Sequence, residues 1–190
     1  MKFFYTLIAV IVLSIAANAQ GKVAIVFSNA FSSDKGGVTK LVSAYAALDA
    51  EFKPTADELT QLNTRLTTIT SELRDLQNKI NAVPTPPNAK QLQDQITQKT
   101  DEGEQLSVTI KRKQEDAKVK YEKAEKTKTD AIIAEISEAL GAYVKAHGID
   151  ILVDGSKLDS LVAFNPTIDI TDAFIKEFNA KSAVGLPVKP

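Results

Sequence analysis

Apolar residues recur early in the chain at alternating steps of three and four. A stripe with a period of 3.5 predicts a helix that must bury a narrow seam against a partner helix. Prolines 84, 86 and 87 follow the stripe, so the chain is expected to reverse there. The stripe, in which only Thr55 is not apolar, consists of Val38, Leu41, Tyr45, Leu48, Phe52, Thr55, Leu59, Leu62, Leu66, Ile69, Leu73, Leu76, Ile80 and Val83.

A second helical pattern begins near Asn88 and has a weaker, more polar seam. Gly103 within it lowers helix stability by about 1 kcal/mol relative to alanine, which favours a flexible arm. Pro54 in the first arm removes a backbone hydrogen bond, so we expect a bend that separates two helices there. The second seam consists of Leu92, Ile96, Lys99, Gly103, Leu106, Ile110, Lys113, Ala117, Tyr121 and Ala124.

Three short apolar runs outside the helical pattern predict strands, at residues 23–27, 149–154 and 161–164. Gly148 is a natural stop for the second long helix. A final amphipathic helix, capped by Asp169 or Thr171, is expected to carry Ala173, Phe174, Ile175 and Phe178.

These elements predict an α+β fold. A small β body, residues 20–37 and 141–181, carries a long protruding antiparallel α-helical coiled-coil hairpin, residues 38–140, with its tip at 83–88 and a flexible tail at 182–190. Three short strands bury too little surface to be stable alone, so we expect the body to form by oligomerisation. The residues expected between subunits are Val23, Ile25, Ile151, Val153 and Val162.

The first residues are typical of a secretory signal. Lys2 precedes an apolar run at 3–15, and Ala17-Asn18-Ala19 fits a small-residue cleavage site, so residues 1–19 are expected to be removed. The alternative is an uncleaved membrane anchor, although the run is short for a bilayer span. The chain has no cysteine, which excludes disulfides and thiolate chemistry.

Charge is balanced overall, with 23 Lys and Arg against 24 Asp and Glu, which gives no reason to expect a nucleic-acid partner. Locally, residues 111–128 contain eight basic and four acidic side chains. Two interpretations remain open, a solvated helix face and a binding patch. The candidate binding residues are Lys111, Arg112, Lys118, Lys120, Lys123 and Lys126.

The pattern predicts no catalytic, metal or cofactor site. His147 is the single histidine, and its place at a helix end favours a local capping role. Five aspartates, Asp150, Asp154, Asp159, Asp169 and Asp172, lie around the later strands and turns, where this residue is common. A paired-carboxylate enzyme would need two of them in one cleft.

The ends of the chain resemble the Skp/OmpH family of periplasmic chaperones. The resemblance rests on the strand start at Lys22-Val23-Ala24, on Gly148-Ile149-Asp150-Ile151-Leu152-Val153-Asp154, and most specifically on residues 165–176, Asn-Pro-Thr-Ile-Asp-Ile-Thr-Asp-Ala-Phe-Ile-Lys. It implies a homotrimer whose helical arms surround a cavity. It also implies an ATP-independent holdase, not an enzyme, that holds unfolded outer-membrane proteins in the periplasm.

The chain departs from the family pattern in three places. Asn165 replaces the usual aspartate, the segment 27–31 lacks the aspartate that usually follows the first strand, and the tip at 83–88 is uncharged. The uncharged tip weakens the case for contact with a membrane surface. Two other functions stay open from the sequence, a structural coiled-coil adaptor or spacer of the cell envelope and, more remotely, an enzyme that uses the aspartates.

Overall fold

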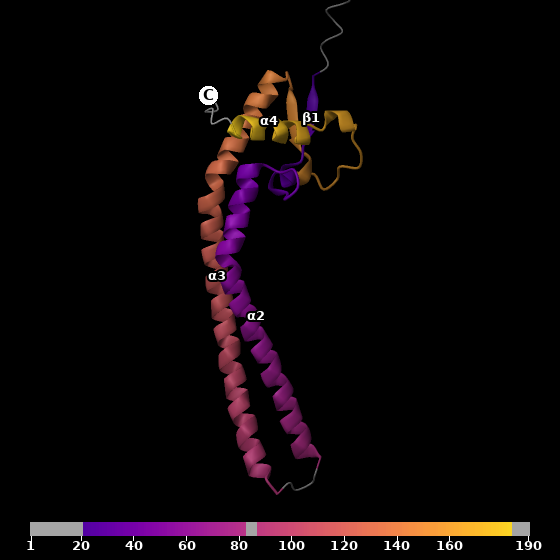
Figure 1. The fold of residues 1–190 in the computed structure, drawn as a ribbon. Helices are drawn as coiled ribbons and strands as arrows, with labels where there is room; N and C mark the ends of the chain where they lie inside the picture. The colour runs from indigo at the N-terminus through magenta and orange to yellow at the C-terminus, as the bar shows by residue number, and fades with distance from the viewer. Residues whose placement is uncertain (1–20, 83–86, 184–190) are drawn as a thin grey trace, which may run out of the picture. The chain divides into compact units, whose positions relative to one another are not determined.

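The computed structural model describes residues 21–82 and 87–183 (Figure 1). The expected signal segment, most of the expected tip and most of the expected tail lie outside these residues. The helices and strands are β1 (Val23–Val26), α2 (Thr39–Asn81), α3 (Ala89–Ala146), β2 (Ile151–Asp154) and α4 (Thr171–Ala183). The chain forms two compact units: the body, with described residues 21–43 and 130–183, and the arm, Ala44–Thr129.

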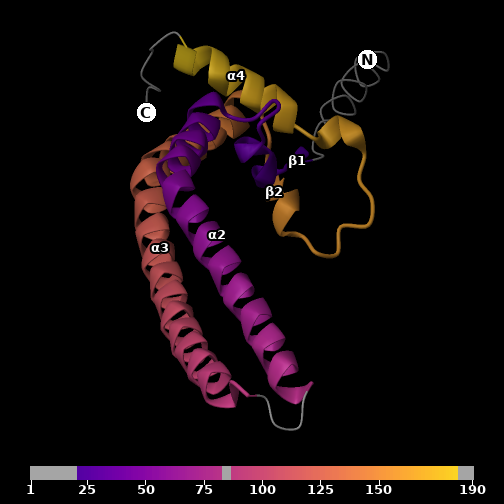
Figure 2. The same cartoon turned by 60° about the horizontal axis from the view of Figure 1, so that its bottom comes forward.

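Within the arm, α2 and α3 lie side by side as an antiparallel hairpin (Figures 1 and 2). The predicted seams are confirmed, since all their described residues are buried or half-buried. Ile69, Leu106 and Ile110 form the centre of the seam, and Ile69 is only 3% exposed. The residues packed against this centre are Leu59, Leu62, Leu66 and Leu73.

Gly103 contributes to this packing. A Cβ atom added to Gly103 would lie 3.4 Å from the Cγ2 atom of Ile69, which is tighter than most carbon contacts. The glycine therefore allows α3 to approach α2 closely at the most buried level of the seam. The sequence pattern indicated only its cost to helix stability, not this role.

The expected division of the first arm at Pro54 is wrong. Helix α2 runs without interruption from Thr39 to Asn81 and contains Pro54. A proline removes only one hydrogen bond from the helix. Here Leu48 before it and Leu59 after it are both held by the seam, and an ion pair of 3.0 Å between the Lys53 Nζ and Asp57 Oδ1 atoms spans it.

The first two predicted strands are present in the body, although both are shorter than expected. β1 and β2 are parallel, with Val23 opposite Ile151 and Val26 opposite Asp154. A parallel pair needs a long crossover connection. The chain supplies it as the two long helices, which return β2 to the side of β1.

The third predicted strand, at 161–164, is wrong for the single chain: these residues have no regular structure. The remaining edge of β1 is used further along, where the Ile170 N–H donates to the Ile25 carbonyl at 2.9 Å and Asp169 forms an isolated bridge to Ile25. The Asn165 side chain accepts from the Thr167 N–H at 3.1 Å and starts a short 3-10 helix, Pro166–Ile168. Residues 161–164 therefore precede the segment that pairs with β1 and do not pair with it themselves.

Both predicted helix ends are confirmed. Gly148 has a φ of 59°, and the Ile149 N–H donates to the Val144 carbonyl at 3.0 Å, which closes the end of α3. At the start of α4, the Asp169 Oδ1 atom accepts from the backbone N–H of Thr171 at 2.9 Å. The Thr171 hydroxyl oxygen in turn accepts from the Phe27 N–H at 2.9 Å, which ties α4 to the end of β1.

Phe174 of α4 is the centre of the body's core. Its ring centroid lies 5.6 Å from that of Phe31 and 5.7 Å from that of Tyr143. His147 stacks on Tyr143 at 3.9 Å, and its Nδ1 atom lies 3.0 Å from the Tyr143 carbonyl oxygen. The single histidine therefore has the local role at the helix end that its position predicted.

Asp154, at the end of β2, gives the body a dependence on pH. Burial acts to raise the pKa of its carboxyl, but hydrogen bonds from Ser28 and Ser156 outweigh burial and hold the pKa below its ordinary value. The stabilisation is therefore present above the pKa of an unfolded aspartate, about 3.9, and is lost as pH falls through the lower folded value.

We expect Asp154→Asn to melt at a lower temperature than wild type at neutral pH. The difference in melting temperature between the two proteins should narrow towards about pH 2. A difference that does not change with pH in thermal melts would contradict the stabilising role of the ionised Asp154 carboxyl.

Candidate functional site

The basic stretch of α3 divides into two groups in the structure. Two of its eight basic residues bridge to α2: the Lys113 Nζ atom lies 2.8 Å from Glu58 Oε1, and Lys128 Nζ lies 3.2 Å from Glu51 Oε2. These pairs hold the two helices of the arm together.

The six candidate residues all lie on exposed positions of α3. Lys118 lies 3.8 Å from Glu122 in the next turn of the helix. Among the residues that the structure describes, no ion pair involves the other five, which are Lys111, Arg112, Lys120, Lys123 and Lys126. At 3.6 residues per turn they spread around the helix and do not form a single patch.

Two cavities in the arm bring some of these lysines next to aromatic surface. The rings of Phe52 and Tyr121 meet edge to face, with their centroids 5.2 Å apart. A cavity of about 350 Å³ includes both rings and Lys118. A second cavity, of about 420 Å³, includes Phe52, Lys120 and Lys123. Lys118 and Lys120 lie on opposite flanks of the seam, so the cavities open on different sides of the hairpin.

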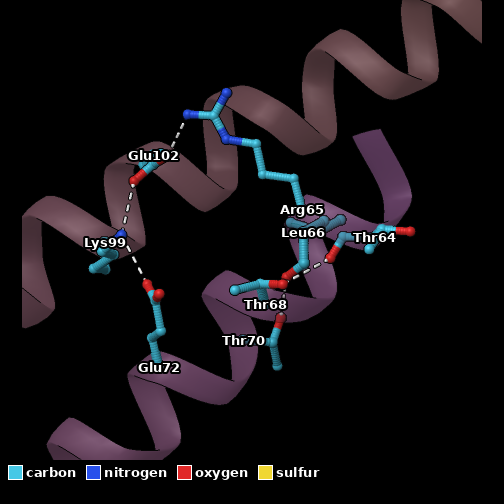
Figure 3. A network of polar contacts seen from close by, with 8 residues as sticks. All are labelled: Thr64, Arg65, Leu66, Thr68, Thr70, Glu72, Lys99 and Glu102. Atoms are coloured by element: carbon cyan, nitrogen blue, oxygen red, sulfur yellow. Dashed lines mark hydrogen bonds and ion pairs between the residues drawn. The ribbon is translucent and has the colours of Figure 1, made fainter. Parts of the chain in front are cut away.

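A polar network fixes the register of the hairpin closer to its tip (Figure 3). The Lys99 Nζ atom lies 2.7 Å from Glu72 and 3.3 Å from Glu102, and Arg65 lies 2.6 Å from Glu102. The hydrogen bond from Arg65, followed by that from Lys99, lowers the pKa of Glu102. Lys99 occupies a seam position, and a polar residue at such a position specifies register and partner in coiled coils.

The α2 residues that form ion pairs with α3 recur at a regular spacing that the apolar pattern did not reveal. Glu51, Glu58, Arg65 and Glu72 are spaced by seven residues, and each pairs with a charged residue on α3. Charged residues that flank a coiled-coil seam recur with this period. A search for charge at the heptad spacing would have found them.

The five residues expected between subunits occupy different environments in the single chain. Ile151 is 56% exposed and Val162 is 96% exposed, while Val23, opposite Ile151, is also exposed. Val153 is half-buried. Ile25 is only 5% exposed and packs inside the body of the single chain. Two further apolar side chains, Leu158 and Phe164, add to the exposed apolar surface.

Three of the clustered aspartates have structural partners. Asp150 Oδ2 accepts from the Lys22 N–H at 2.6 Å, Asp154 accepts from Ser28 and Ser156, and Asp169 accepts from Thr171. Within residues 21–82 and 87–183, no group of three or more histidines and carboxylates is placed to hold a metal ion. In the same part of the chain, no helix has the length and apolar character needed to cross a membrane.

The two units define a class of protein in which a small α/β body continues into an antiparallel helical hairpin. The chain belongs to the family of outer membrane proteins described as OmpH-like, whose model matches residues 37–178. This is a family of chaperones, periplasmic in general. An OmpH-like protein of known structure from Caulobacter crescentus CB15 is 18% identical, with a TM-score of 0.49 over 87% of this chain and 88% of that one. No curated protein matches the chain.

Proposed function

We propose that the chain is an ATP-independent periplasmic holdase for unfolded outer-membrane proteins. The observation that carries this proposal is the OmpH-like family match, which spans both the hairpin and most of the body. The aromatic and basic surface on the flanks of the hairpin supports it, because such a surface can contact an unfolded chain at many points.

The proposed working form is a homotrimer built through the body. β2 has one neighbour, β1, among the described residues, so its other edge is available for a strand from another subunit. Val23 and Ile151 are exposed apolar residues of this sheet, and Val162 is an exposed apolar residue in the segment that follows β2. A parallel pair of four-residue strands is a marginal structure alone, and assembly would bury this surface.

Three arms in one assembly would hold a client without ATP hydrolysis. Each contact with an exposed lysine or a shallow cavity is weak and breaks easily. Contacts on three linked arms act at high effective concentration, so all of them rarely break together. The client is thereby retained but can leave when a stronger acceptor binds it.

Localisation in the periplasm follows from the same proposal. Residues 1–19 would direct export and be removed after Ala19. The mature chain would then meet outer-membrane proteins after these have crossed the inner membrane. Contact of the arm tips with a membrane surface is a weaker part of the proposal, since the tip at 83–88 carries no charge.

The mature protein is expected to suppress aggregation of several unrelated outer-membrane β-barrel proteins diluted from urea. Light scattering measures the suppression, and added ATP should not change it, because no part of the proposal uses nucleotide. Binding of one folded envelope protein, with no effect on the unfolded ones, would favour the structural adaptor instead. Failure to suppress any of them would contradict the holdase proposal.

A further inference from the structure

The cavity on the Lys120 flank of the arm combines apolar surface with a basic rim. It has a volume of about 420 Å³. Phe52 of α2 and Ala124 of α3 supply its apolar wall, and Lys120, Lys123 and Lys128 supply its cations. All of these residues belong to the arm, so the cavity is complete within that unit.

The charges of this cavity do not cancel. Glu51 is the only carboxylate in its wall, and it is held 3.2 Å from Lys128. Lys120 and Lys123 are exposed and have no ion-pair partner in the described parts of the chain. The rim therefore carries a net positive charge beside an aromatic ring.

The neighbouring cavity, which shares Phe52, has no such excess. Its Lys53 is bound to Asp57 at 3.0 Å, its Lys118 lies 3.8 Å from Glu122, and Asp49 is part of its wall. The two flanks of the hairpin are thus similar in apolar character but differ in charge. Only the Lys120 flank is complementary to an anionic ligand.

We propose that the cavity formed by Phe52, Lys120, Lys123, Ala124 and Lys128 binds acidic–apolar segments of unfolded polypeptides. An apolar client side chain would lie against Phe52 and Ala124, and a neighbouring Asp or Glu would face Lys120 and Lys123. This proposal rests on the proposed holdase function and assigns it a preferred client sequence.

The chemistry of the rim suits a client that must later be released. A lysine ammonium is a compact, strongly hydrated charge on a flexible stem, and it does not grip a carboxylate in the fixed bidentate geometry of arginine. The Thr127 hydroxyl donates to the Lys123 carbonyl at 2.8 Å, so it can only accept a further hydrogen bond. Many acidic–apolar segments can therefore occupy the cavity without demanding one geometry.

The test uses the mature full-length protein and fluorescently labelled peptides in anisotropy titrations. One peptide alternates Glu and Phe, a second replaces each Glu by Lys, and a third replaces each Phe by Ser. We expect the first to bind most tightly. The double variant Lys120→Gln/Lys123→Gln should weaken its binding about five-fold at low salt, as expected for two exposed charge contacts. This difference should shrink at high salt, where exposed charges are screened.

The double variant Lys111→Gln/Lys126→Gln is the matched control. It removes the same charge from the same helix at positions outside both cavities, so its effect should stay below about two-fold. Equal losses in the two double variants would overturn the proposal, because the effect would then come from net charge alone. Equal affinity for the Glu and Lys peptides would also overturn it.

The outcome separates this proposal from the holdase function on which it rests. If the wild-type protein suppresses aggregation but shows no preference among the peptides, the holdase function is supported and the proposed site is contradicted. A protein that suppresses no aggregation loses the function itself. Preference of the cavity for anionic lipid vesicles over the Glu–Phe peptide, measured by competition, would assign the site to a membrane surface and overturn the polypeptide proposal.

Discussion

Replacing Ile151 by aspartate is expected to convert the proposed trimer into folded single subunits. Ile151 is 56% exposed in the single chain, so a charge there is compatible with the fold of one subunit. In an assembly built on this surface, the same carboxylate would be buried without a partner, which is strongly unfavourable. Light scattering coupled to size exclusion should show the mass of one subunit, while far-UV circular dichroism keeps the helical content of wild type.

The conservative variant Ile151→Val is the control for this experiment. It keeps an apolar side chain at the centre of the proposed interface, and such a change costs roughly 1 kcal/mol even at a fully buried site. The mass of the assembly should therefore stay that of wild type. A trimer that persists in Ile151→Asp would show that the exposed apolar surface at Ile151 and Val23 is not the interface.

The hairpin could be predicted from the sequence because its physical cause is local and periodic. A seam residue such as Leu62 or Leu106 is buried by one partner helix, so burial follows directly from the 3.5-residue spacing. The same logic applies to the ends of α3 and α4, where Gly148 and Asp169 act on backbone groups a few residues away.

The predictions that were wrong concern segments whose structure depends on contacts with residues far away in the sequence. Residues 161–164 have the composition of a strand, but the remaining edge of β1 is taken by Ile170 and the bridge at Asp169. Pro54 was expected to divide α2, but packing on both sides of it keeps the helix continuous. In each case a tertiary contact decided between local preferences, which neither composition nor spacing reveals.

The candidate site shows the same limit. The sequence identified a basic excess on α3, but not which lysines α2 would neutralise or which would line a cavity. Lys113 and Lys128 each pair with an acidic residue on α2, whereas Lys120 and Lys123 line a cavity with no such partner among the described residues. The pairing of the two helices, and hence their register, was needed to separate structural charges from available ones.

The largest effect on the arm is expected from Ile69→Asp. Ile69 is 3% exposed, lies at the centre of the seam with Leu106 and Ile110, and packs against Gly103 of the facing helix. The change removes an apolar side chain from a packed site and buries a carboxylate there, so we expect the arm to lose about 4 kcal/mol of stability. Far-UV circular dichroism should show a clear loss of helix.

The body is a separate compact unit, so it should still assemble in this variant while the arm loses its ability to retain clients. Thr68→Asp is the matched control, because it introduces the same charge one residue earlier on the exposed face of α2, where the Thr68 hydroxyl only bonds the Thr64 carbonyl. That control should keep its helicity, because threonine and aspartate have similar helix propensities. Equal helicity and equal suppression of aggregation in Ile69→Asp and Thr68→Asp would contradict the view that a closed hairpin is the client-holding element.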